Sequence, residues 1–88
     1  MEEEAILEVA KILEEWNPLG DRANAIDQLE GYRYEAIDII ATIDMMSGSN
    51  RIEKAIAQVL SQAFNLEFDK TTLSKAAKDV GHALGKSN

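Results

Sequence analysis

Apolar side chains recur every three or four positions along most of this chain, and this spacing is the feature that most constrains its fold. The pattern is clearest between residues 52 and 63, where the apolar positions are Ile52, Ala55, Ile56, Val59, Leu60 and Ala63. Residues spaced in this way share one face of a helix with about 3.6 residues per turn, whereas a half-buried strand needs strict alternation. The sequence therefore predicts amphipathic helices.

Three further segments show the same period, at residues 3–16, 34–46 and 73–84. Residues 3–16 form the first predicted helix, which ends at Trp16 because Pro18 disfavours a helical backbone at Asn17 and has no amide hydrogen. Residues 34–46 carry apolar side chains on more than one face, which predicts a central helix. A strand over 36–43 is the alternative, but the polar residues at 35, 38 and 42 fit the helical period better.

End signals complete the prediction of a compact all-α bundle of four main helices. Asp21 and Gly31 suit the start and end of a short extra helix near residues 21–30. Asn50, three residues before Glu53, resembles a capping box that would start the third main helix. The last helix is predicted to begin at Asp69 or Thr71 and to end at Gly85.

Length and charge restrict the class of protein. A chain of 88 residues without cysteine is expected to form one domain, residues 1–88, held by packing alone. Residues 1–69 contain five basic and fifteen acidic side chains, a balance of −10, whereas residues 70–88 carry a balance of +3. An acidic body repels nucleic acid and favours a basic protein partner, although such a charge is also typical of simple solubility.

The most apolar stretch is residues 36–46, which is too short for a membrane span and contains Asp38 and Asp44. The N-terminus is acidic from its second residue, unlike a secretory signal. We therefore expect a cytoplasmic protein with no membrane contact.

Side chains suited to catalysis are few. His82 is the one histidine, and it lies between Lys78 and Lys86 at helical spacing, which favours a solvated side chain over a general base. Glu35 and Asp38 lie one turn apart, but bundle proteins that bind metal at such pairs also need histidines and a second carboxylate helix. We predict no catalytic residue, no metal and no cofactor, and hence no enzyme.

The aromatic residues supply the one candidate binding site. Trp16 ends the first helix, and Tyr32 and Tyr34 precede the central one. If these two helices are antiparallel neighbours, the three rings come close together. The candidate site comprises Trp16, Asn17, Pro18, Tyr32, Arg33, Tyr34 and Glu35. The alternative is that these rings form a small core that fixes the 17–31 connection.

Three motifs in series, EEWNPLG, YRYEAIDII and IAQVLSQAFN, resemble the YugE-like family of small helical bacterial proteins, domain of unknown function 1871. The matching residues are Trp16, Pro18, Tyr32, Glu35, Ala36, Ala63 and Phe64. Asn17 replaces the aspartate of the family pattern, and the segment DRANAIDQLEG is longer than the usual connection. The resemblance implies an all-helical fold and carries no activity.

The leading functional hypothesis is a non-catalytic protein-interaction or regulatory module. The alternative is a small-ligand-binding domain or minor enzyme that uses a pocket near Trp16, Tyr32, Tyr34 and Glu35. A weak homodimer, if formed, is expected to use the surplus apolar surface of the 34–46 helix together with Met45 and Met46.

Overall fold

The first helix, α1 (Glu3–Trp16), has the predicted bounds in a computed structural model that describes residues 3–20, 30–48 and 50–85. Its end is fixed by Asn17, which adopts a left-handed backbone with φ 53° and donates its N–H to the Leu13 carbonyl at 2.8 Å. A non-glycine residue is uncommon in this region, and asparagine is among those that tolerate it. Pro18 then directs the chain away from the helix axis.

The predicted short helix near residues 21–30 falls almost entirely outside the described residues. The described chain resumes with a single 3₁₀ turn, η2 (Glu30–Tyr32), in which Gly31 has φ 63°. Tyr32 also has a left-handed backbone, with φ 65°, and α2 (Arg33–Met45) follows directly. Gly31 therefore has the predicted left-handed conformation. α2 was predicted at residues 34–46, and both of its ends lie one residue earlier in the chain.

The remaining two helices differ in how their first turns are capped. α3 (Arg51–Phe64) follows Asn50, but Asn50 has φ 60° and its side chain makes no capping hydrogen bond, so the predicted capping box is wrong. A capping asparagine needs a β-region backbone to direct its side-chain oxygen at the first free amides. α4 (Lys70–Leu84) is capped as predicted by Asp69, which accepts a hydrogen bond from the Thr72 N–H at 3.3 Å, and it ends at a left-handed Gly85.

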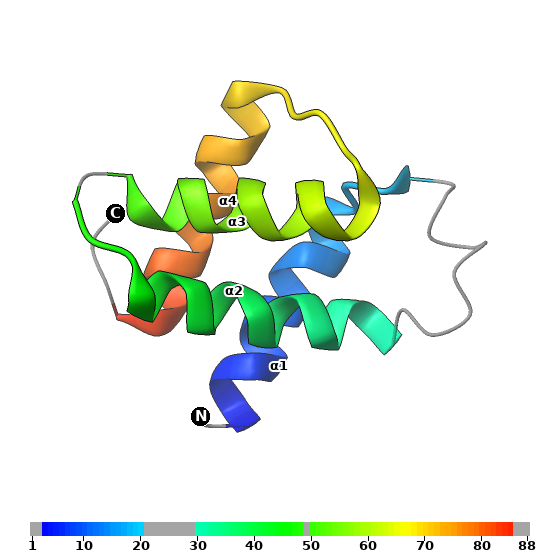
Figure 1. The fold of residues 1–88 in the computed structure, drawn as a ribbon. Coiled ribbons are helices and arrows are strands. Elements are labelled where there is room, and N and C mark those ends of the chain that lie inside the picture. Colours follow the sequence, from blue (N-terminus) through cyan, green and yellow to red (C-terminus); the bar gives the residue numbers. More distant parts are fainter. Residues whose placement is uncertain (1–2, 21–29, 49, 86–88) are drawn as a thin grey trace.

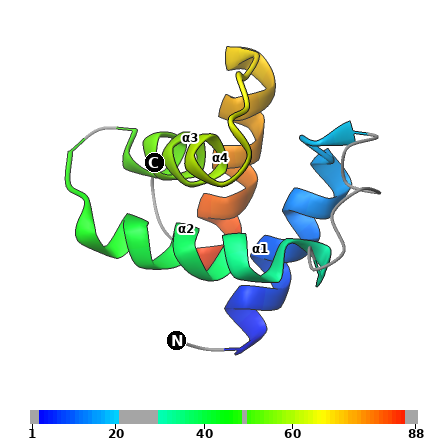
Figure 2. The same ribbon diagram turned by 45° about the vertical axis from the view of Figure 1, so that its right-hand side comes forward.

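The helices form two crossed layers (Figure 1). α2 and α3 lie antiparallel in one layer, and α1 and α4 run in opposite directions across them in the other, as the rotated view in Figure 2 also shows. Each helix packs against two neighbours, in the cyclic order α1, α2, α3, α4. The described residues contain no strand, and the prediction of an all-α bundle of four main helices is confirmed.

The core lies between the two layers. Its largest fully buried side chains are Val9, Leu13, Ile39, Ile43, Ile52, Ile56, Leu60 and Val80. Burying an aliphatic side chain of this size contributes about 1.5–3 kcal/mol, so the core is the main source of stability. α2 needs its broad apolar surface because it contacts both α1 and α3. Met45 is the exception on α2, since its side chain is 87% exposed.

Candidate functional site

Trp16 and Tyr32 of the predicted aromatic group lie in two separate ring pairs, and Tyr34 belongs to neither of them. Trp16 packs against Phe68, with ring centroids 5.7 Å apart and an interplanar angle of 36°. Tyr32 packs edge-on against Phe64, with centroids 6.5 Å apart. Among the described residues, no ring contact joins Trp16 to either tyrosine. The reason is that α2 crosses α1, and phenylalanines at and beyond the end of α3 occupy the space beside both rings.

Tyr32 and Asn17 do come together. The Tyr32 hydroxyl donates a long hydrogen bond of 3.5 Å to Asn17 Oδ1, and the Tyr32 side chain is 2% exposed. Burial raises the pKa of the Tyr32 hydroxyl, and the backbone N–H of Leu19 partly offsets this effect. This contact ties the turn after α1, including half-buried Pro18, to the start of α2. It accounts for Tyr32 and Asn17 as structural residues.

Arg33 makes a two-pronged contact with Glu3 at the other end of α1. Its Nη1 and Nη2 donate to the two carboxylate oxygens of Glu3, the second at 2.7 Å. The Arg33 hydrogen bond holds the pKa of the Glu3 carboxyl below its ordinary value. Both side chains are substantially exposed, and exposed ion pairs contribute little to stability. Arg33 therefore links α1 to α2 at the surface.

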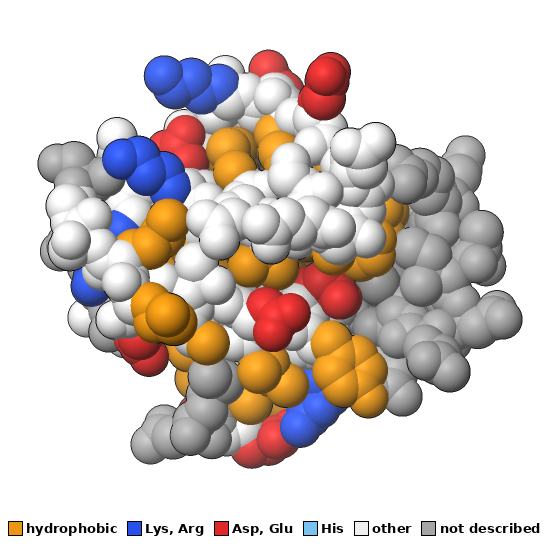
Figure 3. All heavy atoms as spheres, viewed as in Figure 1, with side chains coloured by type: hydrophobic (Ala, Val, Ile, Leu, Met, Phe, Trp, Pro, Cys, Tyr) orange, Lys and Arg blue, Asp and Glu red, His pale blue; other side chains and the backbone are white. Residues whose placement is uncertain are grey.

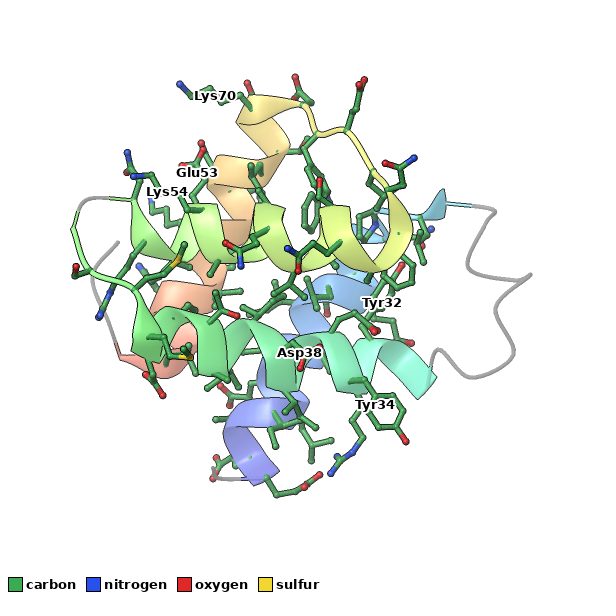
Figure 4. All side chains as sticks on the ribbon, viewed as in Figure 1. Tyr32, Tyr34, Asp38, Glu53, Lys54 and Lys70 are labelled. Atoms are coloured by element: carbon green, nitrogen blue, oxygen red, sulfur yellow. The ribbon has the colours of Figure 1, made fainter. Side chains whose placement is uncertain are left out.

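Glu35 and Tyr34 lie on different sides of α2. Tyr34 is 54% exposed and projects away from α3 (Figure 4). Glu35 is half-buried, and its Oε1 atom is buried without a hydrogen-bond partner. Burial raises the pKa of the Glu35 carboxyl, and the charge of Asp38 adds to that effect. A buried carboxylate oxygen without a donor is destabilising, and Glu35 Oε1 is the one such atom found among the described side chains.

A pocket of about 240 Å³ lies beside Trp16, between α1 and α4. It is lined by Ile12, Glu15, Trp16, Thr72, Lys75, Ala76 and Asp79. Lys75 and Asp79 form an ion pair of 3.2 Å along one wall. None of Tyr32, Tyr34 and Glu35 lines this pocket, so it brings together Trp16 and residues of α4 in place of the predicted neighbours. The cause is the packing of α4 along α1, which gives Trp16 its neighbours from α4.

A second hollow, which we call the α2–α3 groove, runs between those two helices on the face shown in Figure 3. Its volume is about 350 Å³, and it is lined by Asp38, Ala41, Thr42 and Met45 from α2 and by Gln58, Val59, Gln62 and Ala63 from α3. Tyr34 lies one turn before Asp38 on α2, but it projects away from α3 and does not line the groove. Figure 4 shows Asp38 on this outward face.

Sequence reasoning missed the α2–α3 groove as a site. From the sequence, Asp38 is considered as a functional residue only for metal binding, and Gln58 and Gln62 are assigned no role. The available signal was their i, i+4 spacing on the polar side of the 52–63 pattern, opposite its buried face. That signal could not show which other helix the glutamines face, because the pairing of α3 with α2 is a tertiary property.

Comparison with protein-family models, curated proteins and solved structures gave no significant match. None of the helices in the described ranges is both long and apolar enough to cross a membrane. The same residues contain no group of three or more histidine, cysteine, aspartate or glutamate side chains arranged to hold a metal ion.

Proposed function

We propose that this protein is a non-catalytic interaction module that binds another protein through the α2–α3 groove. The observation that carries this proposal is the 87% exposure of Met45 at a hollow between two packed helices. Burial of a methionine side chain on binding contributes about 1.5–3 kcal/mol, and its flexible thioether adapts to varied partner surfaces. Grooves between helices commonly accept a helix from a partner.

The groove chemistry supports binding over turnover. It offers a carboxylate, a hydroxyl and two amides, which can orient a partner, whereas a nucleophile needs a base within hydrogen-bond reach. His82, the one histidine of the chain, lies on α4, which does not line this groove. Location in the cytoplasm and membership of the YugE-like family stay predictions of the sequence alone.

The test compares two variants at exposed apolar side chains. Tagged wild-type protein, Met45→Glu and Leu7→Glu are expressed in the native host, and cross-linked partners are identified by mass spectrometry. Leu7 is the matched control because it is 56% exposed and lies on α1, outside the groove. We expect the specific partner to disappear with Met45→Glu and to persist with Leu7→Glu. Identical partner sets for all three proteins would refute the proposed role of the groove.

A second candidate function is small-ligand binding in the pocket at Trp16. The supporting observation is that the half-buried Trp16 ring lines a hollow of about 240 Å³ with both apolar and charged walls. Native mass spectrometry of the protein purified from its host tests this function directly. A bound small molecule that is lost in Thr72→Trp, which places a large ring at an exposed position of the pocket wall, would favour this candidate. An unliganded mass throughout would leave the interaction module as the better account.

A further inference from the structure

Asp38 is the one charged side chain that lines the α2–α3 groove, and it is exposed. Among the described residues, neither ion pair involves Asp38, and it has no other polar partner. The groove therefore presents a single uncompensated negative charge within otherwise uncharged walls. This composition differs from the chain as a whole, in which 28% of residues are charged.

We infer that the element that docks in the α2–α3 groove is a basic amphipathic helix, with one lysine or arginine opposite Asp38 and an apolar side chain against Met45. This inference rests on the proposed interaction function and names the class of partner. Charge complementarity is its main support: the acidic chain attracts a basic segment, and Asp38 gives that segment a fixed contact.

The spacing along α2 constrains the partner helix. Asp38 and Met45 are seven residues apart, which is about 10 Å at ~1.5 Å per residue. A helix lying along the groove would therefore carry its cation about two turns from its apolar contact. Gln58 and Gln62 on the opposite wall can donate to or accept from polar side chains at the edge of that helix.

Charge also argues against the other occupants. A second copy would bring two chains of net charge −7 together and place two unpaired Asp38 carboxylates in or beside one interface. Nucleic acid would place phosphates against the same carboxylate. A cation at Asp38 would instead be attracted to the carboxylate. It would also offset the negative charge of Asp38 that acts on Glu35 one turn away.

The experiment uses a fluorescent helical peptide of about four turns, with one arginine two turns from a leucine, and a matched peptide with glutamine in place of arginine. Anisotropy gives the affinities, and amide chemical shifts locate the site on the full chain. We expect the arginine peptide to bind about fivefold more tightly than the glutamine peptide, as for a partly exposed ion pair. Asp38→Asn should abolish this difference, whereas Glu8→Gln, an exposed carboxylate on α1, should preserve it.

Each alternative outcome has a defined meaning. Equal binding of both peptides at the groove, lost in Met45→Glu, would overturn the basic specificity and leave the proposed interaction function standing. If neither peptide bound at the groove, the inference would be overturned, while the host cross-linking experiment decides the proposed function separately. Groove shifts that grow with protein concentration alone would assign the surface to a second copy and overturn the inference. Circular dichroism confirms that each variant is folded.

Discussion

Trp16 shows how partial burial changes the expected effect of a substitution. If Trp16 were fully buried in the small core that the sequence offers as the alternative to a binding site, its truncation would cost about 3–5 kcal/mol. The ring is half-buried and packs against Phe68, so we expect Trp16→Ala to lower the free energy of unfolding by about 2 kcal/mol, roughly half of that range. Trp16→Phe should cost less than about 1 kcal/mol because it keeps a ring beside Phe68.

Urea unfolding measures both changes, and Tyr34→Ala is the matched control because Tyr34 is exposed. The control should change stability by no more than about 0.5 kcal/mol. Wild-type emission should lie between the maxima of buried and solvated tryptophan, since Trp16 is the sole indole. An unchanged free energy in Trp16→Ala would show that the packing against Phe68 does not stabilise the protein.

Glu35 predicts a specific dependence of stability on pH. Because burial raises the pKa of this carboxyl in the folded state, the folded protein binds the proton more tightly than the unfolded chain does. This tighter proton binding stabilises the folded protein below the ordinary glutamate pKa. The stabilisation is lost as pH rises through the pKa of Glu35 in the folded state. We expect Glu35→Gln to raise the melting temperature at pH 7, with a gain that shrinks as pH falls towards the ordinary pKa.

The control for this measurement is Glu67→Gln, which alters an exposed carboxylate. It should leave the melting temperature almost unchanged both at pH 7 and at a pH near the ordinary glutamate pKa. A melting temperature for Glu35→Gln that equals wild type at pH 7 would mean that water or a rotated side chain already satisfies Oε1. A decrease at pH 7 would mean that the carboxylate has a stabilising partner.

At the scale of the helix, the N-cap positions of α3 and α4 can be compared directly. Asn50 occupies this position in α3, and Asp69 occupies it in α4. Asp69 accepts the Thr72 N–H, so we expect Asp69→Ala to lower the free energy of unfolding by about 1 kcal/mol. Asn50 makes no such bond and has a left-handed backbone that glycine adopts without penalty. Asn50→Gly should therefore be neutral or slightly stabilising in the same urea titration. A loss above about 1 kcal/mol for Asn50→Gly would reveal a capping role for its side chain.

The helices could be predicted from sequence because their signals are local. Apolar spacing predicts the buried face, and Pro18, Asp69 and Gly85 mark ends through their own backbone preferences. Asn50 shows the limit, since the same residue type suits both a capping conformation and a left-handed one. The choice depends on how the chain enters α3 after α2.

The candidate sites were less predictable because they join residues from helices distant in sequence. The sequence could not show that Phe68 would lie against Trp16, since that contact depends on how α4 and the 65–69 connection pack on α1. The α2–α3 groove likewise requires the antiparallel pairing of two helices. The exposure of Met45 could not be predicted either. The apolar side chains of residues 34–46 cover more than one face of the helix, and the sequence does not show which of them no other helix contacts.

At the scale of the whole molecule, charge and apolar exposure have opposite effects on association between copies. Met45 favours self-association, whereas the net charge of −7 and Asp38 oppose it. Charges are screened beyond about 10 Å at ~0.1 M salt and beyond about 3 Å at ~1 M. We therefore expect any homodimer formed through the α2–α3 groove to strengthen as salt is raised at pH 7.

Sedimentation equilibrium across a salt series measures this dependence. Asp38→Asn should strengthen association at low salt because it removes one charge per copy from the interface, and Met45→Glu should prevent association at every salt concentration. Leu7→Glu provides the control, since it adds the same charge outside the groove. If Leu7→Glu weakened association as much as Met45→Glu, net charge alone would control the dimer. If added salt weakened it, ion pairs between copies would hold the dimer, and a surface other than the groove would have to supply them.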